Sequence, residues 1–214
     1  MPMKLYTYFR SSASFRVRIA LNYKAIAWES AAINLPKSEQ AQGAFRKLNP
    51  AGLVPALEDA GQLLSQSLAI IEYLEETHPQ PPLLPAAPID RAYVRAFAQI
   101  IACEIHPLNN LRTLKHLRRS YKLDEEGVNS WYRHWIAEGF AMMESHLAEN
   151  GKSGRHVYAD QVTMADCCLV PQVFNAKRYE CDIGPYPRVM RIFDACMKLD
   201  AFDAAQPSKQ PDAV

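Results

Sequence analysis

The hydrophobic and polar positions at the start of the chain predict a strand that runs directly into a helix. Residues 4–8 carry aliphatic and aromatic side chains in the manner of a short β-strand. Phe15, Ile19 and Tyr23 then recur with the spacing of a helix that buries one face. The pattern therefore predicts a junction between strand and helix near residue 11.

Three serines, Ser11, Ser12 and Ser14, lie at this junction. A serine hydroxyl at such a boundary caps the helix, because it accepts a hydrogen bond from a backbone N–H that has no partner within the helix. The same helix end carries a partial positive charge, so with Arg10 beside it the junction also suits a bound thiolate or carboxylate. Capping alone accounts for the serines, and anion binding is the alternative that the rest of the chain has to support.

The following residues continue as a strand, a weak helix, two strands joined by a tight turn, and a clear helix. The predicted elements are residues 27–33, 39–48 (with Ala44, Phe45 and Leu48 facing inward), 53–57, 62–64 and a helix after residue 65 with Ser67 as its candidate cap. This order predicts an α/β layer with a small mixed sheet. We expect the two serine-rich helix starts to be able to converge on one ligand.

Pro55 lies inside the third predicted strand, where it cannot donate a hydrogen bond to a sheet. It implies an edge strand, a bulge or a cis peptide bond. Each arrangement leaves the backbone of the neighbouring Val54 available to pair with a ligand.

A proline-rich stretch, residues 79–88, predicts a semi-rigid linker and a domain boundary. Beyond it the hydrophobic period is helical. The predicted helices are 90–117, kinked at Pro107; 125–148, with Trp131, Trp135 and Met142 in the core; 163–177, opened by a capping box and deeply buried; and 187–197. From Ala204 onward we expect a frayed tail.

Composition narrows the possible partners. The 214 residues include 49% hydrophobic and 22% charged residues, and the net charge of +1 gives no electrostatic case for nucleic acid or an anionic membrane. The first residues lack the apolar core of a signal peptide, and no run approaches the roughly 20 apolar residues of a membrane span. Five cysteines without a Cys-x-x-Cys motif favour reduced thiols in the cytoplasm. We expect no metal site, because the histidines are not spaced as ligands with cysteines or paired carboxylates.

An ordered series of motifs resembles the zeta class of the cytosolic glutathione transferases over nearly the whole chain. The motifs are Ser11-Ser12-Ala13-Ser14, Asn49-Pro50, Val54-Pro55, Gln66-Ser67 with the helix that follows, and Met164-Ala165-Asp166 through Val173. The resemblance implies a thioredoxin-like glutathione-binding domain in residues 1–82 and an all-helical substrate-binding domain in residues 83–214. It also implies glutathione as cofactor and a homodimer.

The resemblance assigns roles to individual residues. Ser11 and Ser12 would lie at the glutathione sulfur, with Ser12 stabilising the thiolate. The other implied glutathione contacts are Val54, the cis Pro55, Gln66, Ser67, His106 and Asn110. For the carboxylates of a substrate the candidates are Arg10, Arg112 and Arg178, with His106 beside them, because arginine binds carboxylates through two hydrogen bonds. Ala13 departs from the class, which has cysteine there. Because that cysteine is not the nucleophile, we expect the change to affect the fine tuning of the site more than its activity.

The activity that the resemblance implies is glutathione-dependent cis–trans isomerisation of maleylacetoacetate to fumarylacetoacetate in tyrosine and phenylalanine breakdown. The small cis-enedioate maleylpyruvate, from gentisate breakdown, is an alternative substrate. A broader alternative activity is that of a general glutathione transferase acting on α-haloacids. A non-catalytic module is a further alternative, against which the retained serines and Gln66-Ser67 argue.

Overall fold

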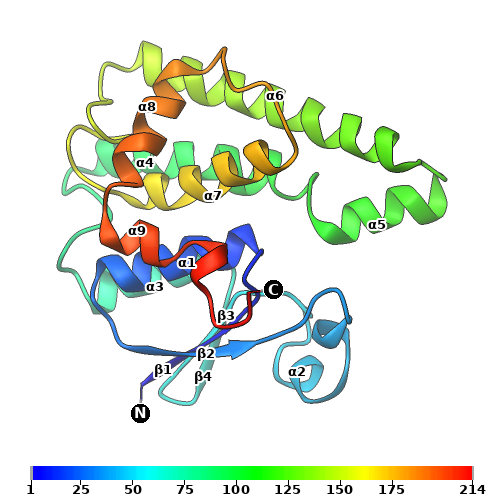
Figure 1. The fold of residues 1–214 in the computed structure, drawn as a ribbon. Helices are drawn as coiled ribbons and strands as arrows, with labels where there is room; N and C mark the ends of the chain where they lie inside the picture. The colour runs from blue at the N-terminus through cyan, green and yellow to red at the C-terminus, as the bar shows by residue number, and fades with distance from the viewer. Residues whose placement is uncertain (1, 214) are drawn as a thin grey trace. The chain divides into compact units, whose positions relative to one another are not determined.

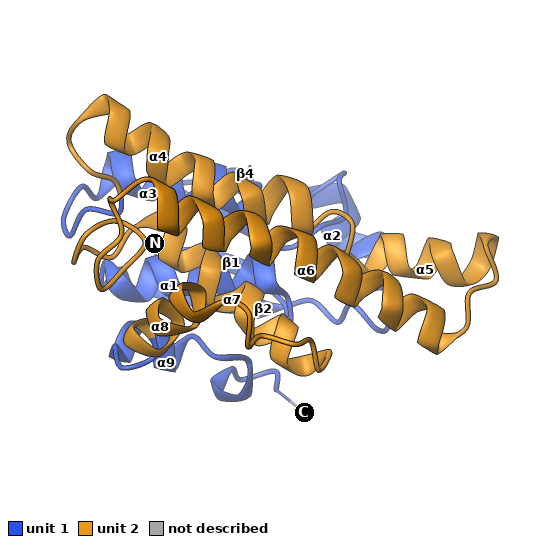
Figure 2. Cartoon of the chain, turned by 90° about the horizontal axis from the view of Figure 1, so that it is seen from above, with its two compact units in different colours: residues 1–83, 197–214 blue, residues 84–196 orange. Residues whose placement is uncertain are grey.

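The computed structural model describes residues 2–213 and contains two compact units, which Figure 2 distinguishes by colour. Unit 1 comprises Met1–Leu83 and Met197–Val214, and unit 2 comprises Leu84–Cys196. The division at Leu83 falls inside the proline-rich stretch. It differs from the sequence-based division, at 82/83, by one residue at this boundary and by placing the last part of the chain, from Met197, with unit 1.

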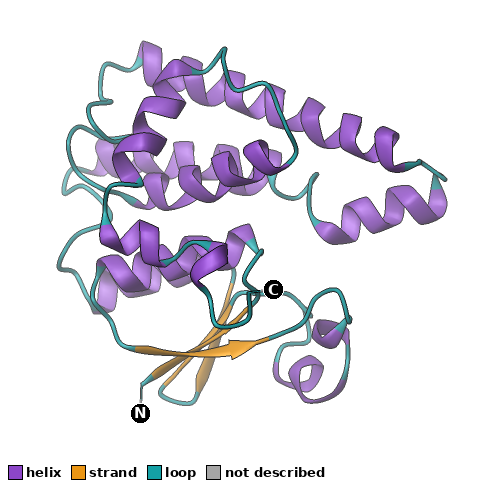
Figure 3. Ribbon diagram, in the orientation of Figure 1, coloured by secondary structure: helices purple, strands orange, loops and turns teal. Residues whose placement is uncertain are grey.

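Unit 1 contains a mixed sheet of four strands among the described residues (Figure 3). The strands are β1 (Met3–Thr7), β2 (Trp28–Ala32), β3 (Ala56–Asp59) and β4 (Gln62–Ser65), in the order β2-β1-β3-β4. β1 is central, parallel to β2 and antiparallel to β3, and Leu5 is paired with Ser30 on one side and Leu57 on the other. These pairings confirm the predicted small mixed sheet.

Helices cover both faces of this sheet. Thr7 faces α1 (Ser12–Tyr23), since its hydroxyl accepts a hydrogen bond from Arg18, and α3 (Ser67–Thr77) packs beside α1. Tyr6 points to the opposite face, where its ring contacts Phe45 of α2 (Gly43–Leu48), which follows the short 3₁₀ helix η1 (Glu39–Ala41). Only Phe45 of α2 is buried, so the expectation that Ala44 and Leu48 face inward is wrong. A helix of six residues presents too narrow a face to bury all three.

The third strand begins later than its apolar residues suggested. Val54 and Pro55 are joined by a cis peptide bond, which is one of the three arrangements that the sequence allowed. The first residue paired in β3 is Ala56, and Val54 therefore precedes the ladder.

The last part of the chain, residues 197–213, is here called the return segment because it packs on unit 1. It contains α9 (Asp200–Ala204) and the 3₁₀ helix η3 (Pro207–Lys209), and Figure 1 shows α9 beside α1. Phe202 is fully buried, and the Gln210 side chain donates to the carbonyls of Ala204 and Gln206. The expected frayed tail is therefore wrong, because buried apolar and polar groups fix this segment.

Unit 2 is helical among its described residues. Its helices are α4 (Pro88–Gln99), the π-helix η2 (Ile100–Ile105), α5 (Leu111–Ser120), α6 (Glu125–Glu149), α7 (Met164–Arg178) and α8 (Pro187–Cys196). The single kinked helix expected over 90–117 is instead broken: it passes through a π-helical turn and ends at His106, immediately before Pro107. His106 still has helical backbone angles, but Pro107 has no N–H to continue the hydrogen-bond ladder, and the chain has turned to an extended conformation by Asn110.

The packing of α6 and α7 tests the predicted core of unit 2. In α6 the buried stripe is Tyr132, Ile136, Phe140 and Met143, whereas Trp131 and Trp135 are half-buried and Met142 is exposed. The predicted stripe was displaced by one residue, because aromatic size does not distinguish adjacent helix faces. α7 is buried along most of its length and opens with the predicted Thr163–Asp166 capping box.

Within residues 2–213, no helix has the length and apolar character that crossing a membrane requires. None of the five cysteines, all of which lie in the described part of the chain, is in a disulfide.

Candidate functional site

The turn between β1 and α1 presents the serines at a helix start. Ser11 N–H donates to the carbonyl of Tyr8 at 2.9 Å and closes the turn. Ser11 is the N-cap of α1, and its Oγ accepts from the backbone N–H of Ser14 at 3.2 Å. Ser12 is the first helical residue and is 7% exposed. Capping by serine is confirmed, and it leaves Ser12 beside the N–H groups of the first helical turn.

The electrostatics of this helix start favour an anion. α1 has no acidic residue in its first turn, and neither does α3, so no side-chain carboxylate there offsets the partial positive charge of either end. Arg10 is exposed at the turn, with its guanidinium 4.9 Å from the ring of Phe9. The turn therefore offers hydroxyls, backbone N–H groups and an exposed cation to a negatively charged group.

The start of α3 lies next to α1. Arg16 of α1 is 2% exposed, and its Nη1 donates to Ser67 Oγ at 3.2 Å. The prediction that Ser67 caps α3 is wrong: the N-cap is Gln66, and Ser67 is the first helical residue, with its hydroxyl turned to Arg16. One arginine side chain of α1 thus reaches the start of α3, and convergence of the two serine-rich ends on one ligand stays a prediction.

Gln66 has an unusual backbone conformation. Its φ is 69° and its ψ is 115°, a combination that residues other than glycine rarely adopt. Such strain persists where the surrounding structure imposes it, and it is common at ligand sites. The Gln66 side chain is exposed at the helix start, next to the buried Ser67.

The loop before β3 is held by a buried asparagine. Asn49 is 4% exposed; its Nδ2 donates to the carbonyl of Leu53 at 2.8 Å, and its Oδ1 accepts from the N–H of Ala51. These bonds fix the approach to Val54 and the cis Pro55. Sequence reasoning identified Asn49 as part of a turn and missed this side-chain role.

Three predicted residues of unit 2 lie within one turn. His106 Nε2 is 3.3 Å from Asn110 Nδ2, and Asn110 caps α5 by accepting from the N–H of Arg112 at 3.0 Å. The Arg112 side chain is exposed. The break at Pro107 creates this turn, which places the imidazole of His106 beside the amide of Asn110.

Arg178 lies elsewhere in unit 2, in the last turn of α7. Its guanidinium is 4.9 Å from the ring of Tyr179, which stacks on Tyr132 with the ring centroids 3.6 Å apart. Burial, the largest effect, together with the neighbouring Tyr179 raises the pKa of Tyr132, so Tyr132 is a neutral phenol in this stack. Arg178 is exposed, which is compatible with binding a carboxylate.

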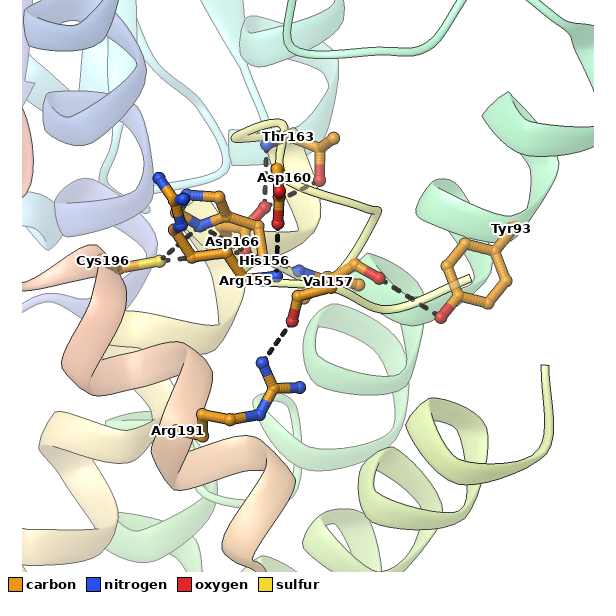
Figure 4. A network of polar contacts seen from close by, with 10 residues as sticks. Tyr93, Arg155, His156, Val157, Asp160, Thr163, Asp166, Arg191 and Cys196 are labelled. Carbon is orange, nitrogen blue, oxygen red and sulfur yellow. Dashed lines mark hydrogen bonds and ion pairs between the residues drawn. The ribbon is translucent and has the colours of Figure 1, made fainter. Parts of the chain in front are cut away.

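A second cluster of chemically active side chains lies within unit 2 (Figure 4). His156, Asp166 and Cys196 are buried, and their candidate ligand atoms lie within 4.8 Å of one another. Each atom already has protein partners, since Cys196 Sγ is 3.5 Å from His156 Nδ1 and Asp166 Oδ1 accepts from Val157 N–H at 3.0 Å. Burial raises the pKa of the Cys196 thiol strongly, which keeps it protonated. We interpret the cluster as a hydrogen-bonded tie between the loop before α7, α7 itself and α8.

Comparison with known proteins places this geometry in a family. The model of the glutathione S-transferase N-terminal domain matches residues 5–82, which carry both serine-rich helix starts. A maleylpyruvate isomerase from Ralstonia sp is 49% identical over 212 residues, covering 99% of this chain and 100% of that protein.

Solved structures agree. The holo structure of a maleylpyruvate isomerase, described as a bacterial glutathione S-transferase of the zeta class, is 48% identical, with a TM-score of 0.97 over 99% of this chain and 100% of the other. A maleylacetoacetate isomerase from Methylobacterium extorquens AM1, solved with malonate and glutathione, is 40% identical, with a TM-score of 0.96 over 99% of each chain. With such similarity along its whole length, the chain belongs to the zeta class of the glutathione transferases, the family of the maleylacetoacetate and maleylpyruvate isomerases.

Proposed function

We propose that this protein catalyses the glutathione-dependent cis–trans isomerisation of maleylacetoacetate to fumarylacetoacetate. The observation that carries the proposal is the serine-capped start of α1, within the matched N-terminal domain of a chain that is similar to such isomerases over its whole length. Bound glutathione supplies a thiolate that adds to one alkene carbon, so that the former double bond rotates before the thiolate leaves.

Unit 1 would hold glutathione. The Ser12 hydroxyl donates a hydrogen bond to the thiolate, and Ser11 holds the turn in place because its Oγ accepts from Ser14 N–H. Hydroxyl donors and a helix start lower the pKa of a thiol, because both stabilise its negative form. Val54, ahead of the cis Pro55 and outside the β3 ladder, would pair its backbone with the cysteinyl part, while Gln66 and Ser67 would hold the γ-glutamyl end.

The arginines would bind the substrate. Arg10, Arg112 and Arg178 are exposed cations, which suits them to the two carboxylates of an enedioate and to the negative charge that develops on its carbonyl oxygen. His106 and Asn110 would contact glutathione from unit 2, where their hydrogen bond already places them together.

Maleylpyruvate is the second candidate substrate. The relative that is 49% identical over its whole length is named for it, and so is the structure with a TM-score of 0.97. Maleylacetoacetate and maleylpyruvate should therefore be offered separately, with and without glutathione, while the trans product is followed. We expect turnover only with glutathione, and the larger kcat/KM identifies the substrate. Equal turnover after complete removal of glutathione would refute the proposal for both substrates.

Replacement of Ser12 tests the role of the hydroxyl. We expect Ser12→Ala to fold normally and to lose about 10²-fold or more in turnover with glutathione saturating, as loss of one charge-stabilising donor does. Ser14→Ala is the matched control: Ser14 Oγ is buried without a hydrogen-bond partner among the described residues, so its removal should leave turnover unchanged. Normal turnover by Ser12→Ala would assign the thiolate to another group.

Assembly and location extend the proposal. We expect a homodimer, for which light scattering should give about twice the chain mass of 24.2 kDa. The five cysteines outside disulfides suit the reducing cytoplasm.

A further inference from the structure

The turn that carries the serines is held from two sides, by a side chain of α1 and by the distant C-terminal part of the chain. On one side is Arg18 of α1, which is fully buried. Its Nη2 donates to the carbonyl of Phe9 at 3.0 Å, and its Nη1 donates to Thr7 Oγ1 at 3.1 Å and to the carbonyl of Tyr8 at 3.4 Å. The carbonyl of Tyr8 is also the acceptor for Ser11 N–H, so Arg18 acts on the bond that closes the turn.

The other side is the return segment. Asp212 Oδ2 accepts from the N–H of Phe9 at 2.9 Å, across 203 positions of sequence. The carbonyl of Ala205 accepts from Arg18 Nε at 3.1 Å. Asp212 and Arg18 therefore bind the N–H and the carbonyl of the same residue, Phe9, and the return segment contacts both the turn and the arginine that holds it.

Arg18 and Asp212 carry opposite charges on either side of the turn. Burial lowers the pKa of Arg18 to about 10, and the carboxylate of Asp212 opposes this by favouring the charged guanidinium. Asp212 Oδ1 is buried and makes no hydrogen bond among the described residues, so it is poorly hydrated beside this cation. Loss of either charge would leave the other poorly hydrated and without its electrostatic partner, which is costly.

We propose that Asp212 is a positioning residue for the glutathione thiolate: together with Arg18 it fixes the Tyr8–Ser11 turn and thereby the hydroxyl of Ser12. The inference rests on the proposed function for its catalytic consequence. Its structural part, a fixed turn, concerns unit 1 alone. The return segment thus takes part in the site although none of its residues touches the reacting atoms.

The test compares Asp212→Ala and Asp212→Asn with Asp203→Asn. Asp203 also lies in the return segment, but its carboxylate binds Gln206 and Lys209 of the same segment, so its loss leaves the turn alone. Asp212→Asn keeps an oxygen that accepts from Phe9 N–H, and should retain most of the function that Asp212→Ala loses.

The first measurement is amide hydrogen exchange of Phe9 to Ser12 in the protein without glutathione. We expect Asp212→Ala to accelerate exchange of Phe9 N–H by about 10-fold or more, and Asp203→Asn to leave it unchanged. The second is the thiol pKa of bound glutathione, followed by thiolate absorbance against pH. We expect Asp212→Ala to raise it by about one unit, with turnover falling by about 10-fold at pH values below the thiol pKa and by less above it.

The outcomes separate the two proposals. Unchanged exchange at Phe9 in Asp212→Ala overturns the positioning role, whatever the activity. Faster exchange with an unaltered thiol pKa and turnover also overturns it, since a purely structural tie would behave in that way. If the wild-type protein neither binds glutathione nor isomerises either substrate, the proposed function fails. The exchange data then still test whether Asp212 fixes the Tyr8–Ser11 turn.

Discussion

Removal of the Asp166 carboxylate should destabilise unit 2 more than substitution of an exposed residue nearby does. Oδ2 accepts from Thr163 N–H at 2.8 Å and from Thr163 Oγ1 at 2.9 Å, and Oδ1 accepts from Val157 N–H at 3.0 Å. Thr163, Val157 and Asp166 are all fully buried. Water therefore cannot replace the carboxylate without rearrangement of the loop before α7.

The magnitude follows from the groups left behind. Asp166→Ala leaves two buried N–H groups without an acceptor, at about 1–3 kcal/mol each. Relief of the desolvated carboxylate offsets part of this loss, so we expect the free energy of unfolding to fall by about 3–4 kcal/mol. For a chain of this size each kcal/mol of lost stability lowers the unfolding midpoint by about 2–4 °C, so we expect a decrease of about 10 °C.

Differential scanning calorimetry and tryptophan fluorescence provide the assay. Trp131 and Trp135 lie on α6 and report on unit 2, whereas Trp28 lies on β2 in unit 1. Two units need not unfold in one transition, so the unit 2 signal is the relevant one.

The control lies in the same loop. Asp160 accepts one hydrogen bond, from Arg155 N–H at 2.9 Å, and is exposed. Asp160→Ala should change stability by no more than about 0.5 kcal/mol, because water replaces the lost partner. If Asp166→Ala unfolded within about 1 kcal/mol of the wild type, like Asp160→Ala, the carboxylate would not be the tie that the geometry indicates.

Three further predictions concern stability. Lys24→Met should lower the free energy of unfolding, measured by denaturant titration, by about 3–5 kcal/mol, because it leaves Glu75 buried without the ammonium 2.7 Å away. Adding Glu75→Gln should recover part of this loss. Gly139→Ala should cost about 1–3 kcal/mol by the same measurement, since a Cβ there would lie 2.2 Å from two side-chain carbons of Ile105. Burial lowers the pKa of His146 from 6.5, so the unfolded chain binds its proton first: stability should fall as pH drops from 6.5 through the lowered pKa, and His146→Gln should flatten this dependence in midpoints measured against pH.

Much of the architecture was predictable because its causes are local. Alternating side chains and helical spacing predicted the strands of unit 1 and the long helices of unit 2, and Ser11 caps α1 as its residue type indicates. The errors arose where another segment of the chain decides. Ser67 has a hydroxyl suitable for capping, but this hydroxyl accepts a hydrogen bond from Arg16 of another helix. Leu48 is apolar, but its side chain is exposed in the folded chain.

The return segment shows the same limit on a larger scale. Two prolines and a polar sequence indicated a frayed end, and nothing local revealed that Phe202 has a fully buried position or that Asp212 has a partner at Phe9. Contacts across about two hundred residues leave no periodic trace in the sequence. The cluster of His156, Asp166 and Cys196 was missed for the same reason, since its members are brought together only by the packing of α7 and α8.

One signal for the site was present in the sequence and was not used. Arg16 and Arg18 alternate with Phe15, Val17 and Ile19 in α1, so two charges occur in a stretch, residues 15–21, whose other residues are all apolar. Such a stretch is buried all round, and each charged side chain in it has to find partners within the protein. Because residues two positions apart point in different directions on a helix, the two arginines serve different partners: Arg16 reaches the start of α3, and Arg18 reaches the serine turn and the return segment. The serines that would meet glutathione are thus indicated by local rules, while their positions depend on buried cations whose partners only the folded chain supplies.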